Sequence, residues 1–358
     1  MDKKKKAFHL FLFLILVIML PLSGCSLMTT QQGQTQKEQT QNGQTPQKDS
    51  SSAKKNEESE GNPPSSEKDN GLEQVTTVVL GQTPAQGTPG APEDQGSYTI
   101  RMEGEIHEED GKIVIEGKSN LLPGSRLRGH ISGKGYGLMG YVDREEVQAN
   151  GNYTLKITKP DIEDIIDIFV EFEPEEQQEK INTYYGQKGE KMTGPLIYLY
   201  DRMVDGKSVM FKKASLKKRL RLKDGDKIVG TFEQPTWDRP ADYGSTKVWI
   251  TTEVKKDDAY VYVKGKSNLL EGCSIYAVMH VPDAILIGYG DGATTNPDGS
   301  FEMAIRYPKS YKEMEVSLEF RPNENSWESI RETYGEKGEK LEGPYVKKGS
   351  NGGKYVEI

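Results

Sequence analysis

The chain has little of the chemistry on which enzymes and cross-linked domains depend. Its 358 residues include only two cysteines and four histidines. The motifs G-x-S-x-G, H-E-x-x-H and C-x-x-C, and glycine loops that cradle phosphate, are all absent from the sequence. Two cysteines cannot make a disulfide-rich scaffold. The sequence therefore predicts no catalytic residue, no cofactor and no disulfide framework.

Basic residues are also in the minority. The chain carries 47 Lys and Arg against 55 Asp and Glu, a formal net charge of −8. Because a nucleic-acid backbone repels an acidic molecule, we expect no nucleic-acid partner. Long apolar runs are equally scarce, and the one that exists lies at the N-terminus.

That N-terminus has the features of an export signal. A basic start, MDKKKK, precedes the apolar run AFHLFLFLILVIMLPL and the string Leu22-Ser23-Gly24-Cys25. The string resembles the lipobox of bacterial lipoproteins, which implies a signal peptide over 1–24 and lipidation of Cys25. The resemblance further implies a protein anchored in the cell membrane on its extracytoplasmic face, since two acyl chains anchor stably. The alternative is an ordinary signal peptide or signal anchor with an incidental cysteine.

The next segment, 25–96, lacks aromatic residues entirely and is rich in Gln, Thr, Ser, Lys, Glu, Pro and Gly. Such a composition buries too little apolar surface to offset the entropy of ordering, so it predicts a disordered tether. As a flexible coil of about 70 residues it would span about 45 Å. The tether would hold the remaining chain away from the membrane.

The rest of the chain is an internal duplication. The hexapeptide GKSNLL begins at Gly117 and again at Gly265, and three further pairs of segments match in the same order. These pairs are NGNYTLKI with DGSFEMAI, VEFEP with LEFRP, and YGQKGEKMTGP with YGEKGEKLEGP. A two-copy unit of this size predicts two domains, which we place at 97–211 and 245–358, joined by a basic, proline-containing connector at 212–244.

Each copy reads as short strands separated by turn signals such as Asp110-Gly111. The run IEDIIDIF is the only segment with a helical look, and we expect it to be a loop that leads into a strand. The spacing predicts an all-β fold of two tandem antiparallel β-sandwiches, and it resembles that of immunoglobulin-like and fibronectin-III-like modules. In this scheme GKSNLL ends a strand: its glycine lies at the strand end, its Asn bonds its own backbone and its leucines close the sandwich edge. The alternative is that it forms a recognition loop.

The most similar segment in the two copies supplies the candidate binding loops. It is YG-x-KGEK-xx-GP, which puts Lys188, Glu190 and Lys191 opposite Lys337, Glu339 and Lys340. Glycines would turn the backbone sharply and project the charges. The alternative is a rigid loop or bulge retained because it positions the last strand.

Three further features have both a structural and a functional interpretation. Asp143 with Asn150, and Asp291 with Asp298, offer oxygen ligands suited to calcium, although such residues also favour turns. The strand LKKRLRL, with six cations between Lys212 and Arg221, predicts either a charged edge strand or a contact with a polyanion such as teichoic acid. The acidic run EFEPEEQQE predicts a solvated surface.

These features predict a non-enzymatic lipoprotein of the cell envelope that displays two binding modules to a cell-wall polymer or a protein partner. Two alternatives remain open at this point. One is an envelope hydrolase or accessory subunit that uses surface carboxylates, and the other is a module that inhibits a protease with an exposed loop.

Overall fold

The structure, a computed structural model, describes residues 88–134, 138–350 and 352–358. All of these belong to one compact unit of the chain. The expected signal peptide, Cys25 and most of the expected tether lie outside the described residues. Within the described part of the chain, none of the helices is long and apolar enough to cross a membrane.

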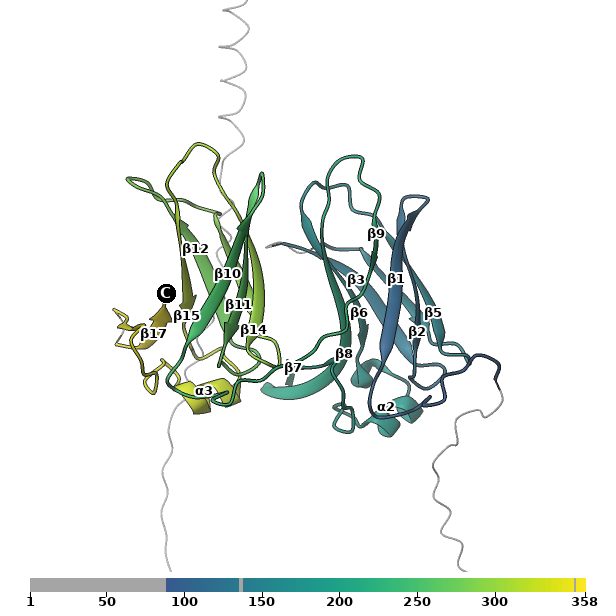
Figure 1. Ribbon diagram of the computed structural model, residues 1–358. Helices are drawn as coiled ribbons and strands as arrows, with labels where there is room; N and C mark the ends of the chain where they lie inside the picture. The colour runs from purple at the N-terminus through teal and green to yellow at the C-terminus, as the bar shows by residue number, and fades with distance from the viewer. Residues whose placement is uncertain (1–87, 135–137, 351) are drawn as a thin grey trace, which may run out of the picture. The chain divides into compact units, whose positions relative to one another are not determined.

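Repeat 1 is a sandwich of two antiparallel sheets (Figure 1, blue to teal). One sheet has the order β5-β2-β1-β9 and the other the order β4-β3-β6-β8-β7. The strands are β1 (Met102–Glu109), β2 (Lys112–Ser119), β3 (Arg126–Gly133), β4 (Val142–Glu146), β5 (Asn152–Thr158), β6 (Ile165–Phe172), β7 (Ile197–Val204), β8 (Lys207–Arg221) and β9 (Val229–Thr231).

Repeat 2 has the same arrangement (Figure 1, green to yellow). Its sheets have the orders β10-β11-β14 and β13-β12-β15-β17-β16. The strands are β10 (Ile250–Lys256), β11 (Tyr260–Ser267), β12 (Ser274–His280), β13 (Gly290–Thr294), β14 (Ser300–Arg306), β15 (Glu315–Phe320), β16 (Val346–Lys348) and β17 (Lys354–Glu357). The predicted all-β fold of two tandem sandwiches is therefore confirmed.

Each sandwich has its own hydrophobic core between its sheets. In β3 the alternate residues Leu127 and Ile131 are buried, as the period of two in a half-buried strand requires. Ile115 of β2 and Ile168 of β6 pack into the same core from opposite sheets, whereas Ile275 belongs to the separate core of repeat 2. Because the two cores are separate, each repeat buries its own apolar side chains, as a domain does.

Short helices interrupt both sandwiches, which the sequence analysis did not predict. A 3₁₀ turn η1 (Pro174–Glu176) and helix α2 (Glu179–Tyr185) follow β6, and α3 (Glu328–Tyr334) follows β15. Seven residues are too few for hydrophobic periodicity to stand out from the strands around them. The run IEDIIDIF at 162–169, expected as a loop that leads into a strand, is a loop only up to Asp164, because β6 begins at Ile165 and includes the rest of it.

The connector expected at 212–244 is mostly part of the two repeats. The boundary at 211/212 falls inside β8, and β9 pairs with β1 of repeat 1. The end of the connector, PADYGS at 240–245, is the counterpart of PEDQGS at 92–97, so each repeat begins several residues before the predicted start. Repeat 1 has one strand more than repeat 2, because the chain that leaves the long β8 continues to β9, which pairs with β1.

The glycines of GKSNLL lie within strands rather than at their ends, which corrects the prediction. Gly117 pairs with Tyr153, and a Cβ on this glycine would lie 2.3 Å from the Tyr153 ring. Gly265 pairs with Phe301, and its Cβ would lie 2.0 Å from that ring. An aromatic ring therefore fills the space over each glycine, and no larger residue fits there.

The Asn of GKSNLL reaches further along the chain than the nearby backbone. Asn120 Oδ1 accepts the N–H of Arg101 at 2.8 Å, and its Nδ2 donates to the carbonyl oxygen of Thr99 at 2.8 Å. Asn268 makes the same two kinds of bond, with Trp249 at 3.1 Å and Lys247 at 3.1 Å. The motif thus fastens the end of the second strand of each repeat to the segment that enters the first strand.

Candidate functional site

The predicted loop of Lys188, Glu190 and Lys191 is built largely by its own side chains. Glu190 Oε2 accepts the backbone N–H of Lys188 at 3.0 Å, and the backbone N–H of Glu190 itself, together with that of Lys188, keeps the pKa of the Glu190 carboxyl below its ordinary value. Lys191 Nζ donates to the carbonyl oxygens of Thr183 and Tyr184, both at 3.1 Å. Lys191 therefore caps the C-terminal end of α2, where helix carbonyls have no partner of their own.

Repeat 2 uses the equivalent residues in the same way. Glu339 Oε2 accepts the N–H of Lys337 at 3.0 Å, and Lys340 Nζ donates to the carbonyl oxygen of Glu332 at 2.5 Å. Lys188 and Lys337 are exposed, and the charge of each acts on the glutamate of its own loop. The similarity of the two copies here has a structural explanation.

The candidate calcium ligands bind backbone N–H groups. Asp143 Oδ2 accepts from Lys156 N at 2.7 Å, whereas Asn150 Oδ1 accepts from Asn152 N at 3.0 Å. Lys156 and Asn152 lie at different places along one extended strand, β5, so the two candidates are held apart.

In repeat 2, Asp291 accepts from Ala304 N at 2.7 Å and Asp298 accepts from Ser300 N at 3.0 Å. Among residues 88–134, 138–350 and 352–358, no group of three or more His, Cys, Asp or Glu side chains is placed to hold a metal ion.

The basic strand β8 lies beside the acidic strand β6, which separates it from β3. Arg219 forms a two-pronged ion pair with Asp167, with N–O distances of 2.8 Å and 2.8 Å. Arg221 pairs with Asp257 and Asp258 of repeat 2. The remaining cations of this stretch are also paired or donate to carbonyl oxygens: Lys212, Lys213, Lys217 and Lys218. The positive charges of this stretch therefore already interact with groups of the protein, and the stretch is not a patch of unpaired cations for a polyanion.

The acidic run, which begins at Glu171 within β6, is buried over its first four residues, contrary to the expectation of a solvated surface, whereas Glu176 and Glu179 are exposed as expected. Glu171 is 2% exposed and lies between Arg128 Nη2 and Lys213 Nζ, at 2.5 Å and 2.5 Å. Burial raises the pKa of Glu171, but Lys213, His130 and Arg128 outweigh it and the pKa is lowered. Burial, with help from neighbouring carboxylates, raises the pKa of Glu173.

These carboxylates do not line a substrate-sized cleft. The free space among Arg128, Glu171, Glu173 and their neighbours is about 10 Å³, room for about one water molecule at most. They form a cross-strand charge network that holds β3, β6 and β8 together.

A larger hollow lies at the far end of the sandwiches, which we call the distal cleft. It occupies about 560 Å³ and receives residues from both repeats. Repeat 1 contributes Lys134, directly after β3, and Asp164, directly before β6. The lining residues of repeat 2 that matter for its chemistry are Tyr260, Leu286, Tyr289, Asp291 and Arg306. This end is opposite to Asn120 and Asn268, since β3 and β12 run away from those residues.

The acidic groups of the distal cleft already have partners. The hydroxyl of Tyr260 donates to Asp164 Oδ1, and Arg306 Nη2 donates to Asp164 Oδ2 at 3.3 Å and to the Tyr260 oxygen at 3.0 Å. Asp291 accepts the N–H groups of Gly292 at 3.0 Å and of Ala304 at 2.7 Å.

Lys134 is the more buried of the two cations that line the cleft, since the Arg306 side chain is 56% exposed. The Lys134 side chain is 12% exposed, and its Nζ lies 3.6 Å from Asp291 Oδ2. The ammonium also lies over the Tyr260 ring, 5.6 Å from its centre. Burial lowers the pKa of Lys134, and Asp291 and Asp164 only partly offset that effect.

Apolar side chains project from the loops at this end. Met139, between β3 and β4, is 92% exposed; Ile285 and Ile287, between β12 and β13, are 93% and 88% exposed. Ile285 and Ile287 flank Leu286 of the cleft wall. We call Met139, Ile285 and Ile287 the apolar tips.

A short repeat that the sequence analysis missed positions these tips. LMGYVD at 138–143 matches LIGYGD at 286–291, with Met139 opposite Ile287. Leu and Tyr of each copy pack on the core of their own sandwich. The glycines, Gly140 and Gly288, take the left-handed φ values of 86° and 84°. The match was within reach of the same self-comparison that found GKSNLL.

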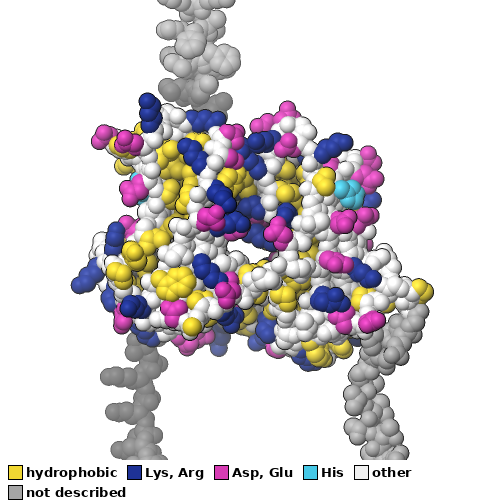
Figure 2. Space-filling model, in the orientation of Figure 1, with side chains coloured by type: hydrophobic (Ala, Val, Ile, Leu, Met, Phe, Trp, Pro, Cys, Tyr) yellow, Lys and Arg dark blue, Asp and Glu magenta, His cyan; other side chains and the backbone are white. Residues whose placement is uncertain are grey.

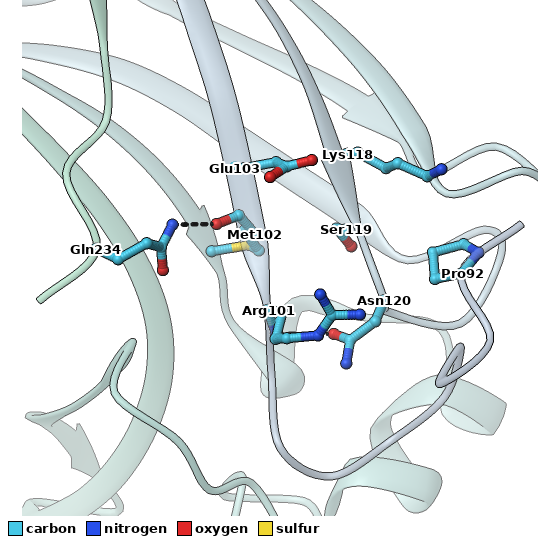
Figure 3. A pocket seen from close by; sticks show the side chains of 8 residues that line it. All are labelled: Pro92, Arg101, Met102, Glu103, Lys118, Ser119, Asn120 and Gln234. Atoms are coloured by element: carbon cyan, nitrogen blue, oxygen red, sulfur yellow. Dashed lines mark hydrogen bonds between the residues drawn. The ribbon is translucent and has the colours of Figure 1, made fainter. Parts of the chain in front are cut away.

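The surface elsewhere is of mixed charge. On the face shown in Figure 2, Lys and Arg side chains are interspersed with Asp and Glu, and no broad area of one sign forms there. A second hollow of about 390 Å³ lies beside the GKSNLL motif of repeat 1 (Figure 3). Its polar groups serve the fold: Gln234 Nε2 donates to the carbonyl oxygen of Met102 at 2.7 Å, and Arg101 pairs with Asp94.

Comparison of the chain with family models, with curated proteins and with solved structures finds no match.

Proposed function

We propose that this chain is a non-enzymatic, lipid-anchored protein of the bacterial cell envelope that binds a protein partner with the distal end of its two sandwiches. The observation that carries the proposal is the pair of equivalent loops, each of which presents an almost fully exposed aliphatic side chain, Met139 or Ile287. Single exposed apolar residues are common on protein surfaces. Here, however, the exposed apolar residues occupy the same position in both repeats and lie beside a cleft, so they are not scattered at random over the surface.

The apolar tips and the start of the described chain lie at opposite ends of repeat 1. The described chain enters repeat 1 at Thr88, at the end where Asp94 bonds Asn120, and the tips lie at the opposite end. The binding surface would therefore lie at the end of repeat 1 that the entering chain leaves open. Aliphatic tips suit apolar side chains of a protein better than a wall polysaccharide, which stacks on aromatic rings.

A photo-crosslinking experiment tests the proposal. The crosslinking amino acid p-benzoylphenylalanine would replace Met139 or Ile287 in cells that make the full chain, and Lys188, Lys337 or Val254 in matched controls. We expect a covalent protein adduct of defined mass from positions 139 and 287 alone. Adducts from positions 188 and 337 instead would move the binding surface to the lysine loops.

Absence of any protein adduct, with the chain sedimenting on purified sacculi, would replace the protein partner with a wall polymer. The anchor has its own test. Cys25→Ala is expected to release the protein from the membrane fraction, and continued membrane association of that variant would refute lipidation at Cys25.

A further inference from the structure

We propose that the distal cleft receives an acidic peptide segment of the partner protein, whose carboxylate binds the ammonium group of Lys134. The inference rests on the proposed function, because it assigns a chemical class to what the same end of the molecule binds. Its evidence is separate: it concerns the interior of the cleft rather than the exposed tips.

The Lys134 ammonium brings unfilled hydrogen-bond donors to the cleft. Lys134 has three N–H bonds, and its nearest carboxylate oxygen, on Asp291, is 3.6 Å away, beyond an ordinary hydrogen bond. Asp291 and Asp164 already accept from N–H and O–H groups of the fold. A ligand that completes the site must therefore bring an acceptor.

The burial of Lys134 favours a charged acceptor. An ammonium removed from water at 12% exposure is costly unless it is paired, and Asp291 at 3.6 Å, with the more distant Asp164, compensates it incompletely. A carboxylate that approached within hydrogen-bond distance would replace the lost solvation, and the dry surroundings would strengthen the pair.

The walls and rim indicate that the carboxylate belongs to a peptide. The volume of about 560 Å³ suits a few residues, not a folded domain. Val278 and Leu286 form aliphatic wall, and Ile285 and Ile287 continue that surface outward. A segment with an Asp or Glu side chain between aliphatic residues matches both the interior and the rim.

Selection from a random peptide library on phage tests the inference. The target is the protein purified in the form in which cells make it, and the strongest selected sequence is then synthesised for fluorescence-anisotropy measurements. We expect the selected peptides to share an Asp or Glu next to aliphatic residues. Replacement of that acid by its amide should weaken binding about tenfold to a hundredfold, which is the usual effect of a lost charge-assisted contact.

Variants of the protein give the complementary measurement. Lys134→Met should weaken the peptide by the same factor, Lys134→Arg should retain binding, and Lys188→Met is the matched control on the opposite end. The amide peptide needs no change in the protein, so the test holds even if a Lys134 variant folds poorly.

Selection of peptides without acidic residues, no enrichment at all, or equal binding of the acid and amide peptides would overturn the inference. Binding of a soluble wall saccharide at Lys134, in the absence of any peptide binding there, would also overturn the inference. The two proposals can fail separately: crosslinks from positions 139 and 287 with no effect of Lys134→Met would leave the proposed function and remove the acidic peptide. Binding of an acidic peptide that depends on Lys134, without crosslinks from positions 139 and 287, would support the acidic-peptide site and remove the apolar tips as the partner-binding surface.

Discussion

The phenolic oxygen of Tyr185 accepts a hydrogen bond from the backbone N–H of Leu122 at 2.9 Å, and Tyr334 accepts from Leu270 at 3.1 Å. Each bond joins the two most similar motifs of the duplication, since the Tyr begins YG-x-KGEK and the Leu ends GKSNLL. Both rings are fully buried, and burial raises the pKa of both hydroxyls. The motifs are therefore two halves of one structural unit that closes the end of each sandwich.

Removal of this oxygen should destabilise the protein. Tyr185→Phe leaves the Leu122 N–H without an acceptor in a buried place, at an expected cost of about 1–3 kcal/mol in the free energy of unfolding. Chemical denaturation measures the loss, and Tyr345→Phe, at a 49% exposed ring, serves as control. Equal stability of Tyr185→Phe and the wild type would show that the bond does not hold the motifs together.

Substitution of the GKSNLL glycine should lower the free energy of unfolding by a similar amount, through steric overlap rather than through a lost hydrogen bond. In Gly265→Ala the new methyl group meets the Phe301 ring at 2.0 Å, and overpacking of this kind costs about 1–3 kcal/mol or more. Gly230→Ala is the matched control in a strand, because the nearest atom to its Cβ is the flexible Lys218 side chain at 3.9 Å. Partial recovery in Gly265→Ala with Phe301→Leu would identify the ring as the cause, whereas no recovery would point elsewhere.

The buried charge network distinguishes the two repeats. Glu171→Gln removes the anion between Arg128 and Lys213, and breaking a buried pair in this way costs about 3–5 kcal/mol. Its counterpart Glu319 pairs with the 43% exposed Arg321, so Glu319→Gln should change stability by less than about 1 kcal/mol. Thermal unfolding of both variants makes the comparison, and comparable losses would contradict the assigned burial.

His130 should make stability fall in mild acid. Burial lowers the pKa of His130 in the folded state and outweighs the attraction of Glu171. The unfolded chain therefore binds the proton first, so the contribution is absent well above the unfolded pKa of about 6.5 and destabilises the fold as pH drops below it. His130→Gln should flatten the unfolding free energy between about pH 7 and pH 5.5 relative to the wild type. Parallel curves for the two proteins would rule this out.

Local patterns carried most of the fold prediction. Asp110-Gly111 was predicted to turn the chain, and both residues adopt the left-handed φ values, 47° and 71°, that such a hairpin needs. Turn residues and alternating apolar residues act over a few positions, so they can be read directly. The helices α2 and α3 escaped because they span only two turns, and the end of repeat 1 was misplaced because β8 passes through the predicted boundary.

The sequence by itself determined that the protein is an all-β duplication, because turn chemistry, strand alternation and repeated segments are local properties of the chain. Only the tertiary structure decided what the charges do. Glu171 is a buried ion-pair partner because the strand order places β6 between β3 and β8, and Lys134 lies near Asp291 because the end of β3 in repeat 1 approaches β13 of repeat 2. Burial and pairing depend on neighbours that lie far away in sequence. Such neighbours bury Glu171 in an ion-pair network, although its sequence context predicts a solvated surface, and they place Lys134 in a cleft where it is a candidate binding group.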